Sequence, residues 1–344
     1  MKSQRWQRSR LVPVAISALA VASGWKPAPP PRVERNSPGV GRGARVLVKA
    51  AAGFLLLLSL GGRESPAVTL AEYARQHPLK LFTATKGTEM PNAIDQANNL
   101  QEGDKALLLS GKGLTDIAGI SRMTVKDTGK PAPITSVKNL HLFFNRNAIA
   151  VIPDEIATLK NVVFIYFNYN QLGTLPRALE EMDSLVGMYF TANQFTEIPE
   201  FVFGMTRLKK LQFSENRIAV LPAAIGNLAE LRHFNMAGNQ IAVLPESVAK
   251  LTRLRVCDFS DNRLTALPEA FGQVRIVNQL RVRNNPLTTL PAGFEAMRAT
   301  IDITGTKIDL ASLPPGLRAK ISTEKPPGSK EEDKIIVRQP PKNK

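Results

Sequence analysis

Cysteine, histidine and tyrosine are scarce in this chain, which has one, three and four copies of them. The single Cys257 cannot form an intrachain disulfide, which excludes a cysteine-stapled extracellular framework. Asn-x-Ser/Thr acceptors, Gly-rich phosphate loops, HExxH and GxSxG motifs are also missing. These absences favour a bacterial or intracellular protein. We expect no enzymatic activity, no cofactor and no metal site, because no general acid or base accompanies a nucleophile.

The positive charge of the chain lies mostly at its two ends. The net charge is +16, of which residues 1–65 carry +9 and residues 318–344 carry +4. The long middle part is therefore close to neutral. Because a phosphate-binding surface needs clustered Lys and Arg, we expect no nucleic-acid partner.

Two apolar runs near the N-terminus resemble export signals. Residues 11–22 follow three arginines, and residues 50–60 follow a second basic group. Both runs are shorter than the roughly 20 residues that cross a bilayer, so we expect no stable membrane span. Residues 1–67 are predicted to be a leader with a Pro/Arg-rich linker, and the protein to be exported to the periplasm, cell surface or medium. A bipartite leader and a translation start downstream of Met1 both fit this pattern.

A repeat of 23 residues dominates the remainder of the chain. Its clearest mark is a Leu-Pro or Ile-Pro step at equal intervals, at Ile152, Leu175, Ile198, Leu221, Leu244, Leu267 and Leu290. Each step ends the pattern LxxLxLxxNxLxxLP, in which the LxL pair predicts a short strand with one face in the core. The proline fixes φ on the return segment, where no sheet hydrogen bond is needed.

This pattern resembles the leucine-rich-repeat family, in particular its 23-residue Leu-Pro class of bacterial and intracellular members. The resemblance covers residues 106–314. It implies an α/β solenoid, a horseshoe with a parallel β-sheet on its concave face and irregular or short-helical convex segments. We expect an N-terminal cap at 68–105 with a helix from Thr69 to Gln76. About seven regular and two degenerate repeats are expected over 106–317, with a loop at 121–136 and a disordered basic tail over 318–344.

One asparagine recurs in each repeat at the point where the chain leaves the strand. A carboxamide both donates and accepts hydrogen bonds, so stacked asparagines can satisfy the backbone groups exposed by a sharp turn. We predict a structural ladder of Asn147, Asn170, Asn193, Asn216, Asn239, Asn262 and Asn285.

The strand positions that the repeat leaves free should face the concave side and bind a partner. These positions are aromatic in the first repeats and charged in the last ones. Aromatic side chains commonly anchor a bound partner, and charged side chains can orient it. The candidate partner-binding residues are Phe143, Phe164, Tyr166, Tyr169, Tyr189, Lys210, His233, Asp258, Arg281 and Arg283. We expect the five rings to form one contiguous patch. The alternative is that the cap or the 121–136 loop folds over it.

The expected function is recognition of a protein or peptide on the concave face. A structural spacer of the cell envelope and a carbohydrate-binding surface are the alternatives. His141 and His233 stand four repeats apart, too far to share a metal ion, and are expected to be polar surface residues. Cys257 occupies a core position and is expected to be a buried apolar filler.

Overall fold

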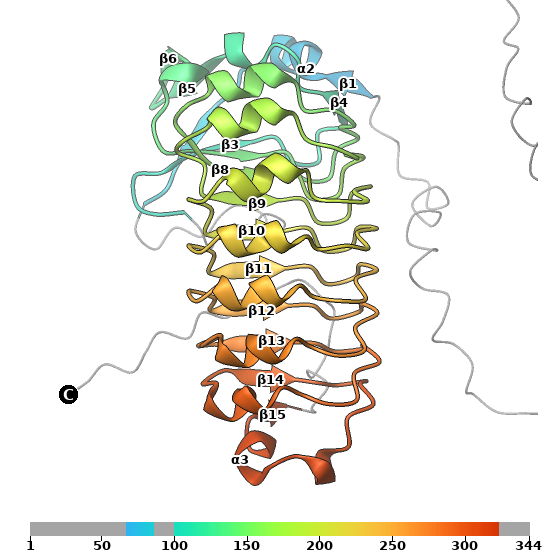
Figure 1. Ribbon diagram of the computed structural model, residues 1–344. Helices are drawn as coiled ribbons and strands as arrows, with labels where there is room; N and C mark the ends of the chain where they lie inside the picture. The colour runs from blue at the N-terminus through green and yellow to red at the C-terminus, as the bar shows by residue number, and fades with distance from the viewer. Residues whose placement is uncertain (1–66, 86–99, 323–344) are drawn as a thin grey trace, which may run out of the picture. The chain divides into compact units, whose positions relative to one another are not determined.

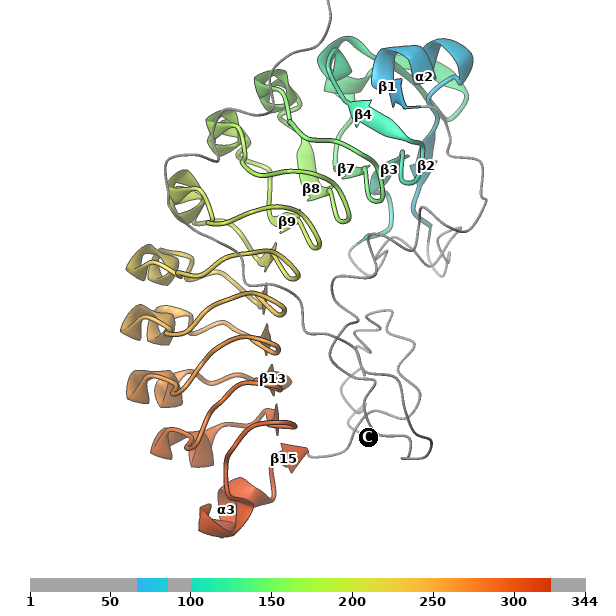
Figure 2. The ribbon, with the colours of Figure 1, turned by 90° about the vertical axis from the view of Figure 1, so that its right-hand side faces the viewer.

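The computed structural model describes residues 67–85 and 100–322. In this part of the chain, each turn contributes one short strand and one 3-10 helix to a solenoid (Figures 1 and 2). The strands form an eleven-stranded sheet of order β15-β14-β13-β12-β11-β10-β9-β8-β7-β3-β2. The sheet lines one side of the solenoid and the 3-10 helices line the other, as Figure 2 shows. The predicted leucine-rich-repeat architecture is confirmed.

The repeat strands are parallel and in register, so that equivalent residues lie side by side. Leu211, for example, pairs with Met188 on one side and with Phe234 on the other. These side chains enter the core together with the other buried leucines, isoleucines and phenylalanines. The strands are β7 (Leu140–Phe143), β8 (Val162–Tyr166), β9 (Gly187–Tyr189), β10 (Lys210–Gln212), β11 (His233–Asn235), β12 (Val256–Asp258), β13 (Gln279–Arg281) and β14 (Thr300–Asp302).

The convex segments are short 3-10 helices, each preceded by the proline of the Leu-Pro step. The proline takes an extended conformation, as at Pro222 with φ −74° and ψ 159°, and directs the chain from the strand side into the helix. The helices are η5 (Asp154–Thr158), η6 (Arg177–Glu181), η7 (Glu200–Gly204), η8 (Ala223–Asn227), η9 (Glu246–Lys250), η10 (Glu269–Gln273) and η11 (Ala292–Ala296).

The N-terminal end of the solenoid is closed by a helix and two strands. Helix α2 (Leu70–Gln76) begins one residue after the predicted start, because Thr69 is its N-cap and forms a reciprocal capping box with Glu72. Strand β1 (Val68–Thr69) pairs with β4 (Leu114–Asp116). Strand β2 (Leu81–Thr83) runs antiparallel to β3 (Lys105–Leu108), which is the strand of the first, degenerate repeat.

The expected loop at 121–136 is a β-hairpin, so that expectation is wrong. Between helices η3 (Ile120–Arg122) and η4 (Ile134–Ser136), strand β5 (Thr124–Asp127) pairs antiparallel with β6 (Lys130–Pro133). Thr128 and Gly129 form the turn with positive φ values of 50° and 86°. The two prolines of β6 obscured the strand in the sequence, since proline removes a sheet donor.

At the C-terminal end, regular structure continues further along the chain than the sequence predicts. Helices η12 (Leu310–Ser312) and α3 (Pro315–Arg318) are followed by β15 (Ile321–Ser322), which pairs with β14. The disordered tail predicted from residue 318 is therefore wrong for residues 318–322, because this strand satisfies the free edge of β14. The predicted leader, apart from its last residue, 67, lies outside the described residues, as does the tail beyond Ser322.

The predicted asparagine ladder is present in every regular repeat. Asn216 shows its pattern: its Nδ2 donates to the carbonyl oxygens of Phe190, Phe213 and Ser214 at 2.9–3.0 Å. Its Oδ1 accepts the backbone N–H of Phe195, in the preceding repeat, at 3.0 Å. One buried amide thus makes hydrogen bonds to four backbone groups, of which only the Ser214 carbonyl also accepts a backbone N–H, that of Ala192.

Replacing Asn216 by alanine should lower the free energy of unfolding by about 1 to 3 kcal/mol, because buried backbone groups would lose their partner. Urea denaturation followed by circular dichroism measures this change. Asn227, exposed in η8, is the matched control, and Asn227→Ala should change stability by no more than about 0.5 kcal/mol. Equal effects of the two substitutions would contradict the structural role of the ladder.

Candidate functional site

Three aromatic rings of the concave side stack across neighbouring strands. Phe143, Tyr166 and Tyr189 are register partners on β7, β8 and β9, with ring centroids 4.2 and 4.6 Å apart. Phe143 and Tyr166 are 0% exposed and Tyr189 is 5% exposed. They form a second apolar cluster, separate from the main core, with Ala106 and the half-buried Phe82 of the cap strand β2. These three rings are interior side chains, as the self-packing alternative requires.

Phe164, on β8, keeps part of its surface exposed within this cluster, as Phe82 does. Its ring lies over Gly187, its register partner on β9, and a Cβ atom at Gly187 would stand 2.2 Å from that ring. Glycine is therefore required for this approach. Lys210 lies on the next strand, with its Nζ 6.0 Å from the centroid of the Phe164 ring. Burial lowers the pKa of Lys210 to about 8.

Tyr169 does not belong to the aromatic stack, so the prediction of one five-ring patch is wrong on this point. It follows β8 in the turn, with φ 57°, and is 47% exposed. The corresponding residues of neighbouring repeats, such as Arg146 and Ala192, also have positive φ. The chain turns at this position before it reaches the ladder asparagine. Tyr169 consequently lies at the edge of the sheet, where Arg146 Cζ is 5.5 Å from its ring centroid.

His141 is buried, which corrects its expected place on the surface. Its Nε2 lies 3.2 Å from Asp104 Oδ2, and its ring stacks on Phe164 with centroids 4.8 Å apart. Burial lowers the pKa of His141, and the Asp104 carboxylate opposes that shift. The sequence did not identify Asp104, because only the pairing of β3 with β7 brings the start of the first repeat beside His141.

His233 is half-buried on β11. Burial lowers the pKa of His233 to about 4, and the positive charges of Lys210, Arg255 and Arg232 add to the shift. Cys257 is completely buried on β12, as predicted, and burial raises the pKa of its thiol.

The charged end of the concave face consists of two ion pairs across neighbouring strands. Arg281 Nη1 lies 3.4 Å from Asp258 Oδ2, and Arg283 Nε lies 3.7 Å from Asp302 Oδ2. Both aspartates are buried, whereas about a quarter of each arginine side chain is exposed. Asp302 was missed in the sequence, although it stands between Ile301 and Ile303 at the same repeat position as Asp258 and Arg281.

The residues that the structure describes include no group of three or more His, Cys, Asp and Glu that could hold a metal ion. Over the same residues, no helix is long and apolar enough to cross a bilayer.

Comparison with known proteins agrees with the repeat geometry. A family model described as leucine rich repeat matches residues 188–241, the segment from β9 through the ladder residue Asn239. This segment is therefore identified as leucine-rich repeats, and the described part of the chain has the solenoid architecture of such proteins. Proteins of this family are generally non-enzymatic scaffolds and commonly bind other proteins. No curated protein matches the chain.

Several solved structures are similar to parts of the chain. A leucine-rich-repeat protein of Leptospira interrogans is 26% identical, with a TM-score of 0.48, over 59% of this chain and 55% of that one. An internalin of Listeria monocytogenes is 22% identical, with a TM-score of 0.45, over 56% and 59%. The leucine-rich-repeat ectodomain of the receptor kinase GASSHO1/SCHENGEN3 from Arabidopsis thaliana, in complex with CASPARIAN STRIP INTEGRITY FACTOR 2, is 27% identical, with a TM-score of 0.49, over 63% and 26%. The chain thus spans little more than half the length of the first two proteins.

The depressed pKa of His233 predicts a loss of stability in acid. The unfolded chain takes up a proton below pH 6.5, whereas the folded chain resists protonation down to about pH 4. The free energy of unfolding should therefore fall as the pH drops from 6.5 to 4, by on the order of 1 to 3 kcal/mol from this residue. Urea denaturation at a series of pH values measures the fall.

His233→Gln should make that pH dependence shallower. Gln279→Asn, at the same repeat position two strands away, controls for the change of a half-buried polar side chain and should leave the slope as it is in the parent. An unaltered slope in His233→Gln would refute the assignment.

Proposed function

We propose that the chain is an exported, non-enzymatic binding protein that recognises a protein or peptide on the concave face of its sheet. The observation that carries the proposal is a contrast between two kinds of strand position: those that keep the same type of residue in every repeat, and those whose residue type varies. Core and ladder positions repeat one chemistry, whereas the concave positions of β10 to β13 change from strand to strand. Their half-buried side chains include Lys210, His233, Gln279 and Arg281.

The two ends of this surface differ in a way that suits an extended partner. Phe164 offers an apolar ring at one end, and Arg281 and Arg283 offer cationic groups at the other. Each arginine is paired with a buried aspartate of a neighbouring strand, which restricts its orientation before a partner arrives. A peptide lying across the strands would place an apolar residue on Phe164 and an acidic residue near the arginines.

The buried stack of Phe143, Tyr166 and Tyr189 supports this surface rather than contacting the partner. Its packing joins β7 to β9 beside Phe164. Export is supported by the two signal-like runs in residues 11–22 and 50–60.

A displayed library of random peptides, selected on the immobilised full-length chain, tests the proposal. Selected peptides should bind about tenfold or more weakly to a variant with Phe164→Ala, Lys210→Ala and Arg281→Ala, because anchor and charge contacts are lost together. The control variant carries Arg217→Ala, Val220→Ala and Arg263→Ala, three exposed positions outside the strands. Circular dichroism confirms that both variants are folded. Equal binding to the two variants would place recognition elsewhere and favour a structural role.

A further inference from the structure

The chain segments that lead into strands β10 to β13 carry mostly positive charge. The four segments 204–209, 227–232, 250–255 and 273–278 together contain seven Lys or Arg residues and one acidic residue. We call this margin of the sheet the upstream edge. Its basic residues are Arg207, Lys209, Arg232, Lys250, Arg253, Arg255 and Arg275. The near-neutral charge of the central part of the chain therefore conceals a strongly basic edge.

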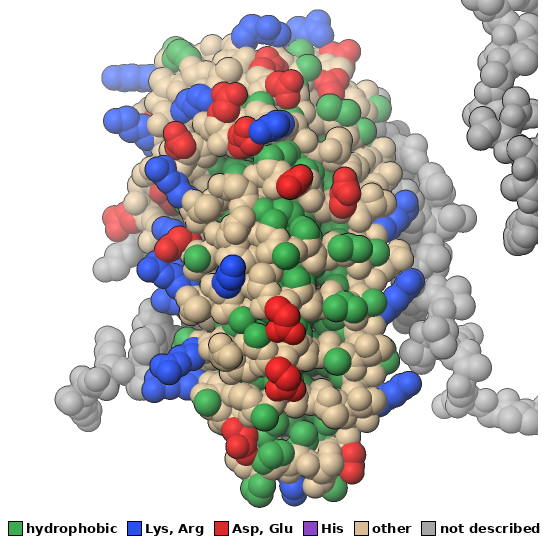
Figure 3. All heavy atoms as spheres, in the orientation of Figure 1, with side chains coloured by type: hydrophobic (Ala, Val, Ile, Leu, Met, Phe, Trp, Pro, Cys, Tyr) green, Lys and Arg blue, Asp and Glu red, His purple; other side chains and the backbone are tan. Residues whose placement is uncertain are grey.

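Acidic residues gather elsewhere on the solenoid. The first turns of the convex helices carry acids such as Glu200, Glu246 and Glu269. Figure 3 shows many Asp and Glu side chains over these helices and many Lys and Arg side chains along the two sides. The margin on the other side, downstream of the strands, alternates in sign, as with Glu215 next to Asn216 and Arg217. The upstream edge thus carries a net excess of positive charge, and its one acidic residue, Glu230, is paired with Arg253.

Three of the basic residues form a row fixed by the backbone. The N–H of Arg232 donates to the carbonyl oxygen of Lys209, and the N–H of Arg255 donates to that of Arg232, both at 2.8 Å. The three side chains therefore start from the residues just before adjacent strands, about 4.8 Å apart. Like charges at this spacing repel, and within residues 67–85 and 100–322 none of the three forms an ion pair. The positive charges of Arg232 and Arg255 also contribute to the lowered pKa of His233.

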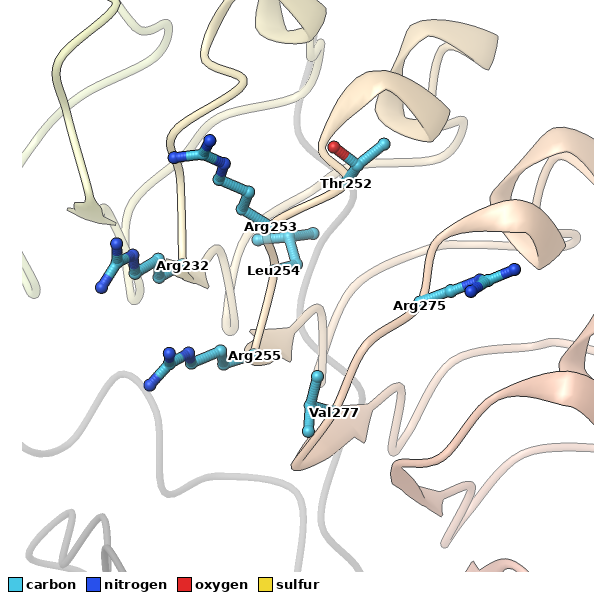
Figure 4. Close-up of a pocket in the computed structure, with 7 residues that line it drawn as sticks. All are labelled: Arg232, Thr252, Arg253, Leu254, Arg255, Arg275 and Val277. Carbon is cyan, nitrogen blue, oxygen red and sulfur yellow. The ribbon is translucent and has the colours of Figure 1, made fainter.

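A hollow of about 260 Å³ opens beside this row. Its lining includes Arg232, Arg253, Arg255 and Arg275 together with Thr252 and Val277. In Figure 4, the guanidinium groups of Arg232, Arg253 and Arg255 extend toward one side of the hollow, and Arg275 extends toward the other. Val277 is 54% exposed and offers an apolar contact, while Thr252 offers a hydroxyl group.

We propose that the upstream edge binds a linear anionic polysaccharide, with its carboxylate or sulfate groups along the row Lys209, Arg232 and Arg255. A polymer with acidic groups at regular intervals matches cations set at the regular spacing of the strands. Arginine pairs with carboxylate and sulfate through two parallel hydrogen bonds. Sugar rings present both hydroxyl groups and apolar C–H faces, which suit Thr252 and Val277.

The composition of the edge argues against nucleic acid as the occupant. The four upstream segments contain no aromatic residue, so unpaired bases would have no ring on which to stack. The proposal is independent of the concave face, because the row stands before the strands and not on them.

Fluorescence anisotropy with two labelled polymers tests the proposal on the full-length chain. Heparin presents sulfate groups in addition to carboxylates, whereas polygalacturonate presents only carboxylates, so binding of heparin alone would indicate recognition of sulfate. At least one should bind, and its affinity should fall as salt is raised, because bound counterions are released. Neutral dextran should not bind. Binding of neither polymer would overturn the proposal, as would equal binding of duplex DNA or polyglutamate.

A charge-reversed variant locates the site. Lys209→Glu, Arg232→Glu and Arg255→Glu together should weaken binding about 100-fold or more. The control carries Arg217→Glu, Arg263→Glu and Lys307→Glu, exposed residues of the downstream margin, and has the same net charge. The control should bind within about threefold of the parent. Equal losses in the two variants would mean attraction by net charge or by the basic chain ends, and would refute the site.

A second variant with smaller charge changes is needed in case the charge-reversed variant does not fold. Arg232→Gln and Arg255→Gln together remove two charges without adding repulsion across the strands, and should weaken binding about tenfold. Retention of full affinity by this variant would also contradict the proposal.

Discussion

Each turn of the solenoid depends on a buried asparagine side chain. The chain leaves a strand through a residue of positive φ and turns sharply, which strips several backbone groups of their sheet partners. The ladder asparagine satisfies these groups in its own repeat and in the repeat before it, as Asn239 does for Met236, Phe213 and Ile218. Neighbouring repeats are thereby fixed in register. The leucine and phenylalanine core can then pack as one continuous stack rather than as separate small clusters.

The register of the strands determines at which positions of the repeat the residue type can vary. Since equivalent positions lie side by side, a change of residue type in one repeat alters one point of a regular array. The concave positions vary in shape and charge, which suits recognition of a particular partner, whereas the upstream edge repeats Lys209, Arg232 and Arg255 at one position. Two surfaces with different physical properties therefore arise from the same repeat.

The repeat made most of the fold predictable, because its period fixed the strands, the ladder and the convex prolines. The ends were harder to predict, since the hairpin at 124–133 and β15 lie outside the period. The candidate site was predicted only in part. Strand alternation placed Phe143 and Tyr166 on the concave side. It did not predict that Phe82 of the cap strand β2 packs against their cluster, or that strand pairing brings Asp104 beside His141. Contacts between segments that are far apart in the sequence are not part of the repeat, so the period does not predict them.

Amide hydrogen exchange tests the role of the ladder most directly. The backbone N–H groups of Leu172, Phe195, Ile218 and Ile241 lie outside the strands, and each donates to the ladder asparagine of the next repeat. If the ladder holds the turns, these four amides should exchange as slowly as those of the strands β9 to β11. Exchange at the rate of exposed loop amides would show that the turns open independently of the sheet, and would contradict the account.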